Sequence, residues 1–161
     1  MKTDLPSSDQ LSASHHVQAA RARKKAEALA CGIDDALISA LVERFYENVR
    51  RDVQLGPIFD KRIKDWPLHL ARMKDFWASI MIESGRFSGS PMQKHIAVGG
   101  LGARHFDHWQ SLWRHTVTEI APSEEVRERF LQAAGRIGNS LLTGIELARG
   151  GLAAVSLLRS S

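Results

Sequence analysis

Cysteine is almost absent from this sequence, and its scarcity excludes several kinds of site. Cys31 is the only cysteine among 161 residues. No disulfide can therefore form within the chain, and no zinc or iron–sulfur site can be built from several thiolates. The 12 glycines and 5 prolines are too few for a collagen-like or low-complexity chain. A single free cysteine is also typical of proteins in a reducing compartment.

Long apolar runs are missing as well. The longest weakly polar stretch covers residues 150–158, roughly half of what a helix needs to cross a bilayer. Asp4 and Asp9 lie near the start with no apolar run after them, which is not typical of a signal peptide. We therefore expect no membrane partner and a cytoplasmic location.

Positive charge is moderate and mostly dispersed. The formal net charge is +4, and the sequence pI is about 9.6. One basic cluster contains Arg21, Arg23, Lys24 and Lys25. Nucleic-acid binding needs clustered charge rather than net charge alone, so we expect no nucleic-acid partner. A helical interaction module that uses this cluster to bind an acidic partner or nucleic acid, without a cofactor, is the alternative function.

Hydrophobic periodicity predicts a single all-α domain of five or six helices. Apolar residues recur at steps of three and four, the spacing of one helix face. These stripes cover residues 37–49, 69–80, 106–116 and 126–145. Helix N-caps are expected at Asp34 or Asp35, at Ser90 before Pro91, and at Ser123. No run alternates in the way that a half-buried strand requires.

Composition divides the chain into four segments. Residues 1–16 are polar and serine-rich, and we expect them to form a disordered tail. Residues 17–32 are rich in strong helix formers and predict a helical extension that ends at Gly32. The patterned domain covers residues 33–149. Residues 150–161 are expected to form a C-terminal tail.

Two histidines are the strongest candidates for chemistry. His69 lies on the apolar face of its predicted helix, and His95 lies in a short element flanked by glycines. An imidazole on an apolar face needs a partner, because burying it unpaired costs free energy. Each is therefore either a core residue bonded to a carbonyl or a ligand. No cysteine or carboxylate lies in register with them, so the pair does not suggest zinc.

Other polar and aromatic residues add to this pattern. His105 and His108 lie one helical turn apart; a solvated helix face is the favoured interpretation, and a zinc site is the alternative. Tyr46 is the only tyrosine and lies on an apolar stripe. The four tryptophans are Trp66, Trp77, Trp109 and Trp113. Core packing is the expected role of each aromatic residue alone.

The aromatic residues and the two histidines together have a more specific meaning. Tyr46 and the tryptophans, combined with His69 and His95, predict a helical pocket with one axial donor facing several hydrogen-bond donors.

The order of short motifs resembles the group III truncated haemoglobins over residues 34–148. The motifs are Phe45-Tyr46-Glu47-Asn48-Val49-Arg50, Leu55-Gly56-Pro57-Ile58-Phe59, Asp65-Trp66 with His69, Phe76-Trp77, Gly89-Ser90-Pro91-Met92-Gln93-Lys94-His95, and Phe106-x-x-Trp109. Each motif is weak alone, but the set in this order is strongly specific. The resemblance implies a shortened globin fold, a two-over-two helical sandwich around haem b.

The resemblance also implies a role for each site residue. His95 matches the proximal iron ligand, and we expect its other ring N–H to donate to a carbonyl near Pro91. Tyr46, His69 and Trp109 match the distal residues that stabilise a bound ligand. Gating of the pocket and direct binding of iron are the two alternative roles of His69. The expected haem contacts are Phe45, Phe59, Arg72, Met73, Phe76, Trp77 and Met92. Arg72 either pairs with a propionate or remains a solvated charge.

The ligands that the resemblance implies are small and diatomic. They include dioxygen, nitric oxide, carbon monoxide and cyanide. Nitric oxide oxidation or peroxide reduction would need an external electron donor, because no reductase domain fits in this length.

Overall fold

The computed structural model describes residues 7–159, and within this range the chain forms seven α-helices and no strand. The helices are α1 (Ser8–Cys31), α2 (Asp35–Arg51), α3 (Gly56–Arg62), α4 (Trp66–Ile82), α5 (Pro91–Ala97), α6 (Ala103–Ile120) and α7 (Glu124–Arg159). The all-α prediction is confirmed. One helix more is present than the prediction of five or six allows, because residues 56–62, which lie outside the predicted apolar stripes, form α3.

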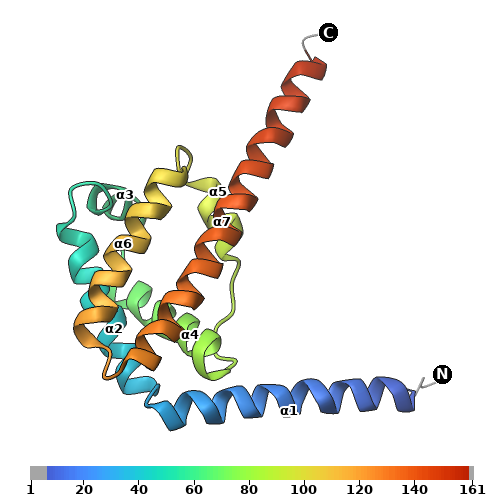
Figure 1. Cartoon of the computed structure of the whole chain (residues 1–161). Coiled ribbons are helices and arrows are strands. Elements are labelled where there is room, and N and C mark those ends of the chain that lie inside the picture. Colours follow the sequence, from blue (N-terminus) through green and yellow to red (C-terminus); the bar gives the residue numbers. More distant parts are fainter. Residues whose placement is uncertain (1–6, 160–161) are drawn as a thin grey trace.

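Two helix pairs form the body of the molecule. α2 packs on α4, α6 packs on α7, and the first pair lies across the second through contacts of α2 with α6 and of α4 with α7 (Figure 1). The short helix α5 lies along α7. This is the predicted two-over-two sandwich. The remaining short elements, α3, α5 and the loop before α5, lie beside these two helix pairs and contribute to the cavity wall.

α2 carries the apolar face on which the sandwich is built. Its N-cap is Asp34, whose Oδ1 accepts the Leu37 N–H at 2.8 Å. Apolar side chains then recur on one face and are at most 1% exposed: Ile38, Leu41, Val42, Phe45 and Val49. Each such burial stabilises the fold by about 1.5–3 kcal/mol. Asn48 on the same helix donates from Nδ2 to Thr116 Oγ1 at 3.0 Å, which ties α2 to α6.

A tight turn brings α3 close to the end of α2. The Asp52 carboxylate accepts the N–H groups of Gln54 and Leu55, both at 2.9 Å. Gly56 follows, and a Cβ there would lie 3.0 Å from the Arg50 carbonyl oxygen. Only glycine permits this approach without a shift of the backbone. The turn therefore places the start of α3 directly against the last turn of α2.

α1 begins at Ser8, which corrects the expectation of a disordered tail through residue 16. Ser7 and Gln10 form a reciprocal capping box, in which Ser7 Oγ accepts the Gln10 N–H and Gln10 Oε1 accepts the Ser7 N–H. The polar composition of this stretch concealed that local signal. Residues 1–6 lie outside the described residues. α1 extends away from the sandwich and contacts α4 only near its end (Figure 1), where Lys24 Nζ lies 3.1 Å from Glu83 Oε1.

α7 continues past residue 149, where the sequence indicated a tail. It passes through Gly150 and Gly151 and ends at Arg159, so its last turns extend beyond the sandwich (Figure 1). Mid-helix glycines lower helix propensity by about 1 kcal/mol each but do not by themselves end a helix. Among residues 7–159, no helix is long and apolar enough to cross a membrane.

Candidate functional site

A cavity of about 780 Å³ opens between α2, α3, α4, α5, α6 and the loop before α5. Ligand pockets typically measure roughly 300–1,000 Å³. Seven of the residues predicted for the site line it: Tyr46, Phe59, His69, Arg72, Met73, His95 and Trp109. The residues come from helices far apart in the sequence, so the fold assembles most of the predicted site in one place.

His95 is oriented by a hydrogen bond within its own short helix. Its Nδ1 lies 2.6 Å from the carbonyl oxygen of Pro91, one turn earlier in α5. A carbonyl can only accept, so Nδ1 carries the proton and donates it. The lone pair of this neutral imidazole is then on Nε2, the form that binds a metal ion. The bond is the one expected from the sequence.

His69 faces the same cavity but has an unpartnered ring nitrogen. Its Nε2 is buried and has no hydrogen-bond partner among residues 7–159. Burial is the main cause that lowers the pKa of His69 to about 4, and the positive charges of Lys94 and Arg72 contribute to the same shift. The ring is therefore neutral at neutral pH. Buried polar atoms without partners are rare, so this nitrogen is a candidate for contact with a group bound in the cavity.

Tyr46 and Trp109 add two more hydrogen-bond donors to the cavity lining. The Tyr46 ring meets the His69 ring edge-on with 5.0 Å between centroids, and it meets Phe59 at 5.8 Å. Burial raises the pKa of Tyr46, so its hydroxyl keeps its proton and remains a donor. Trp109 on α6 lines the cavity as well. The cavity thus has His95 on one element and up to three hydrogen-bond donors on others.

Two residues expected to touch a haem lie in the core instead. Phe45 is 1% exposed and packs edge-on against Trp113 with 4.9 Å between centroids. Trp77 is 4% exposed and stacks on the same indole with 4.4 Å between centroids. Neither lines the cavity. Apolar periodicity marks a buried helix face, but it does not separate the part that packs on other helices from the part that lines a cavity.

Phe76 and Met92 are also outside the cavity lining. Phe76 packs edge-on against Phe87, 5.2 Å between centroids. The Met92 thioether lies where a Cβ on Gly144 would be, so this side chain fills the contact between α5 and α7. One face of α5 contacts α7 and another lines the cavity. The sequence of this short helix does not show on which of the two faces Met92 lies.

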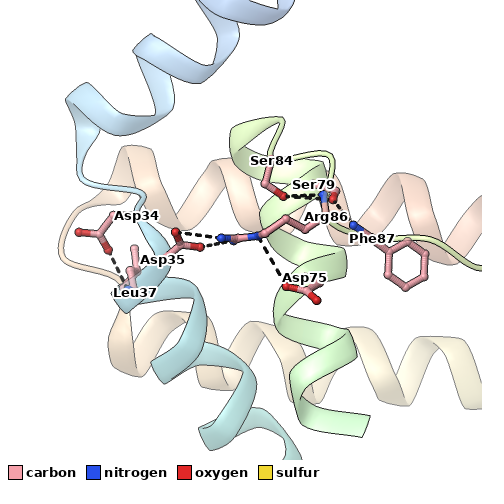
Figure 2. Close-up of polar contacts among 8 residues, drawn as sticks. All are labelled: Asp34, Asp35, Leu37, Asp75, Ser79, Ser84, Arg86 and Phe87. Atoms are coloured by element: carbon pink, nitrogen blue, oxygen red, sulfur yellow. Dashed lines mark hydrogen bonds and ion pairs between the residues drawn. The ribbon is translucent and has the colours of Figure 1, made fainter. Parts of the chain in front are cut away.

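Arg86 and Phe87 line the cavity from the loop between α4 and α5, and no sequence pattern pointed to them. Figure 2 shows how they are held. The Arg86 guanidinium bonds to Asp35 at the start of α2 and lies 3.6 Å from Asp75 on α4. The Phe87 N–H donates to Ser79 Oγ at 3.1 Å. These partners are distant in sequence, so no local pattern could have found them.

Phe106 also lines the cavity and was not among the predicted haem contacts, although a local pattern pointed to it. It lines the cavity one turn before Trp109, on the same apolar stripe of α6. The i, i+3 spacing from Trp109 was a sufficient signal, because side chains three apart share a helix face.

The alternative zinc site does not form. His105 Nδ1 accepts the Gly102 N–H at 3.0 Å, while His108 Nε2 lies 2.7 Å from Asp52 Oδ2. Among residues 7–159, no group of three or more His, Cys, Asp or Glu side chains could hold a metal ion. The two imidazoles instead stabilise the start of α6 and the turn before α3.

Comparison with known proteins identifies the family. No family model matches the chain. A relative, the Group 3 truncated hemoglobin ctb of Campylobacter jejuni, is 33% identical over 111 residues, which is 66% of this chain and 87% of the relative. The chain belongs to the group 3 truncated haemoglobins. This confirms the resemblance found in the sequence motifs and disfavours the interaction module as an account of the whole chain.

Solved structures of truncated haemoglobins share the fold over about two thirds of this chain. The crystal structure of the group III truncated hemoglobin from Campylobacter jejuni has a TM-score of 0.66 and 31% identity, and the match covers 70% of this chain and 91% of that one. The 2/2 hemoglobin from Synechococcus sp. PCC 7002, in the cyanomet state with covalently attached heme, has a TM-score of 0.59 and 23% identity, covering 69% and 90%. The second likeness supports the fold alone.

Proposed function

We propose that this truncated haemoglobin binds haem b in the cavity, with His95 as the proximal iron ligand, and that it takes dioxygen as its ligand. The observation that carries the proposal is the 2.6 Å contact between His95 Nδ1 and the Pro91 carbonyl oxygen on the cavity wall. This bond fixes the ring and leaves Nε2 as the ligating atom. The similarity to the Group 3 truncated hemoglobin ctb supports haem binding at the level of the family.

The other residues of the cavity fit a haem. The unpartnered Nε2 of His69 suits a site whose hydrogen-bond partner is not part of the protein chain. Phe59 and Met73 offer apolar wall, and Arg72 and Lys94 offer positive charge for propionate groups. When bound, haem supplies the iron at which dioxygen or another diatomic molecule is held. Nitric oxide, carbon monoxide and cyanide are expected to enter the same position.

The distal side chains are proposed to act as hydrogen-bond donors. The Tyr46 hydroxyl and the Trp109 indole N–H donate to the ligand, and neutral His69 donates when its proton is on Nε2. Bound dioxygen carries partial negative charge, so each donor slows its release. Nitric oxide oxidation or peroxide reduction at this site would draw on an external electron donor.

Replacement of His95 tests the proposal. Wild-type protein mixed with haem should show a Soret band and bind carbon monoxide in the ferrous state. His95→Ala should lose this spectrum, and added imidazole should restore it by filling the vacant ligand position. His115→Ala, an exposed position on α6, is the matched control and should behave as wild type. Retention of the unchanged wild-type spectrum by His95→Ala would contradict the proposal.

A further inference from the structure

Three tryptophans form a continuous stack that leads from the cavity into the core. Trp109 lines the cavity, and its ring lies within 6° of parallel to that of Trp113, with 6.3 Å between centroids. Trp113 is in turn stacked on Trp77, at 4.4 Å and 8°. Trp113 is 0% and Trp77 4% exposed. We refer to Trp109, Trp113 and Trp77 as the tryptophan ladder.

The ladder differs from the other aromatic contacts of this core. Among the aromatic pairs of residues 7–159, the two stacked pairs are both in the ladder, and the remaining pairs are edge-on or tilted. Edge-on packing is sufficient to fill a core with aromatic rings. Trp77 and Trp113 are close enough for their π systems to overlap, Trp109 and Trp113 are parallel but offset, and indole is among the side chains that lose one electron most readily. The stack therefore has the geometry of an electron path as well as of a packed core.

We propose that the tryptophan ladder carries oxidising equivalents away from the haem cavity when hydrogen peroxide reacts there. The inference rests on the proposed haem binding. In each step one electron moves toward the cavity, and the indole that supplied it becomes oxidised by one electron. The oxidised site therefore moves in the opposite direction, from Trp109 to Trp113 and then to Trp77. Oxidative damage is thereby displaced from the ligand-binding residues to a tryptophan on α4.

The electrons and atoms of this process balance. Hydrogen peroxide is the oxidant, and its reduction to two water molecules takes up two electrons and two protons. Withdrawal of two electrons in succession from Trp77 allows one water to add to the indole, with release of two protons. The net change converts one peroxide and one indole into one hydroxylated indole and one water. An external reductant that supplies the two electrons instead would leave Trp77 unmodified.

Trp66 provides an internal comparison. Its ring lies 6.0 Å from that of Tyr46, so it too is close to the cavity. The Arg50 guanidinium carbon, however, lies 4.5 Å from the centre of the Trp66 ring. A positive charge over an indole opposes the loss of an electron from it. Trp66 is thus a tryptophan near the site that is poorly suited to the relay.

Peptide mass spectrometry after peroxide treatment tests the relay in the full-length, haem-loaded protein. Wild type should gain one oxygen atom on Trp77. Trp113→Phe should lose this modification although Trp77 is still present, while Trp66→Phe should retain it. Circular dichroism and the Soret band show whether each variant is folded and loaded. Trp77 oxidation that persists in Trp113→Phe, or that is absent from loaded wild type, overturns the relay.

Electron paramagnetic resonance of the frozen wild-type protein provides a test without any variant. Ring-deuterated tryptophan should change the hyperfine structure of the radical that peroxide produces. A change seen only with ring-deuterated tyrosine would report Tyr46, the only tyrosine, and would overturn the relay. Absence of any Soret band after haem addition overturns the proposed function and the relay with it. A normal Soret band with unmodified Trp77 overturns the relay alone.

Discussion

Two histidines on one cavity differ in what their ring nitrogens contact. His95 is bonded through Nδ1 to a carbonyl of its own helix, so its orientation is set by the protein. His69 has a buried Nε2 with no partner in residues 7–159, so its orientation can respond to whatever occupies the cavity. The first arrangement suits a permanent ligand of iron, and the second suits contact with a molecule that comes and goes.

Removal of single distal donors should speed dioxygen release. Each net hydrogen bond is worth about 1 kcal/mol, so Tyr46→Phe and Trp109→Phe should each raise the dissociation rate by about fivefold. Stopped-flow displacement of dioxygen by carbon monoxide measures the rate. Phe106→Leu changes the cavity wall without removing a donor and should leave the rate near that of wild type. Unchanged dissociation in both donor variants would show that these groups do not contact the ligand.

The depressed pKa of His69 should make stability depend on pH. A histidine in the unfolded chain titrates near 6.5, and folded His69 has a pKa of about 4. Between these values the unfolded chain binds the extra proton and the folded protein does not. The titration of His69 therefore does not lower the free energy of unfolding above about pH 6.5. It lowers that free energy progressively as the pH falls toward 4.

Urea unfolding measures this effect of His69. The loss between about pH 7 and pH 4.5 should be about 1–2 kcal/mol smaller in His69→Gln than in wild type, a value reduced from the full shift because the ring is partly exposed. Both proteins are measured without haem, so that acid release of the cofactor does not contribute. An equal loss in the two proteins would mean that His69 titrates normally in the folded state.

At the scale of single residues, the order of the motifs predicted which residues line the cavity, but the pattern along one helix did not predict what each side chain contacts. Tyr46, His69, His95 and Trp109 all line the cavity, as their motifs indicated. Phe45 does not, although it precedes Tyr46 on the same buried face of α2. Adjacent positions on a buried helix face point in directions about 100° apart. Which of them meets a cavity depends on the neighbouring helices, and the sequence of one helix does not contain that information.

At the scale of elements, the short connection between α2 and α3 is sensitive to one added carbon. A Cβ at Gly56 would lie 3.0 Å from the carbonyl oxygen of Arg50, so Gly56→Ala must move α3 and with it Phe59. We expect a loss of about 1–3 kcal/mol in the free energy of unfolding, measured by urea titration. Gly135→Ala on α7, where an added Cβ meets nothing within 4 Å, is the control and should be neutral or slightly stabilising. Wild-type stability of Gly56→Ala would contradict the close contact.

Element boundaries were predictable where a local cap sets them. Asp34 caps α2, which begins at Asp35, and α5 begins at Pro91 as its residue type indicated, although the predicted cap Ser90 makes no side-chain hydrogen bond. The loop between α4 and α5 was not predictable, because the pairing of Arg86 with Asp35 joins residues 51 positions apart. The far end of α7 was not predictable either, because its apolar stripe ends at residue 145 while the helix continues to Arg159.

At the scale of the whole molecule, stability should reside in the sandwich and not in the outer part of α1. Residues 7–20 are exposed along their whole length, whereas Ile33, just after α1, is 0% exposed. Deletion of residues 1–20 should therefore change the free energy of unfolding by less than about 0.5 kcal/mol.

Ile33→Ala should cost about 2–5 kcal/mol, because it opens a void where α1 joins the sandwich. Chemical unfolding at two protein concentrations compares the deletion and this substitution with wild type. A large, concentration-dependent loss in the deletion would show that the exposed part of α1 packs against a second copy of the chain. Stability would then belong to an assembly and not to the single sandwich.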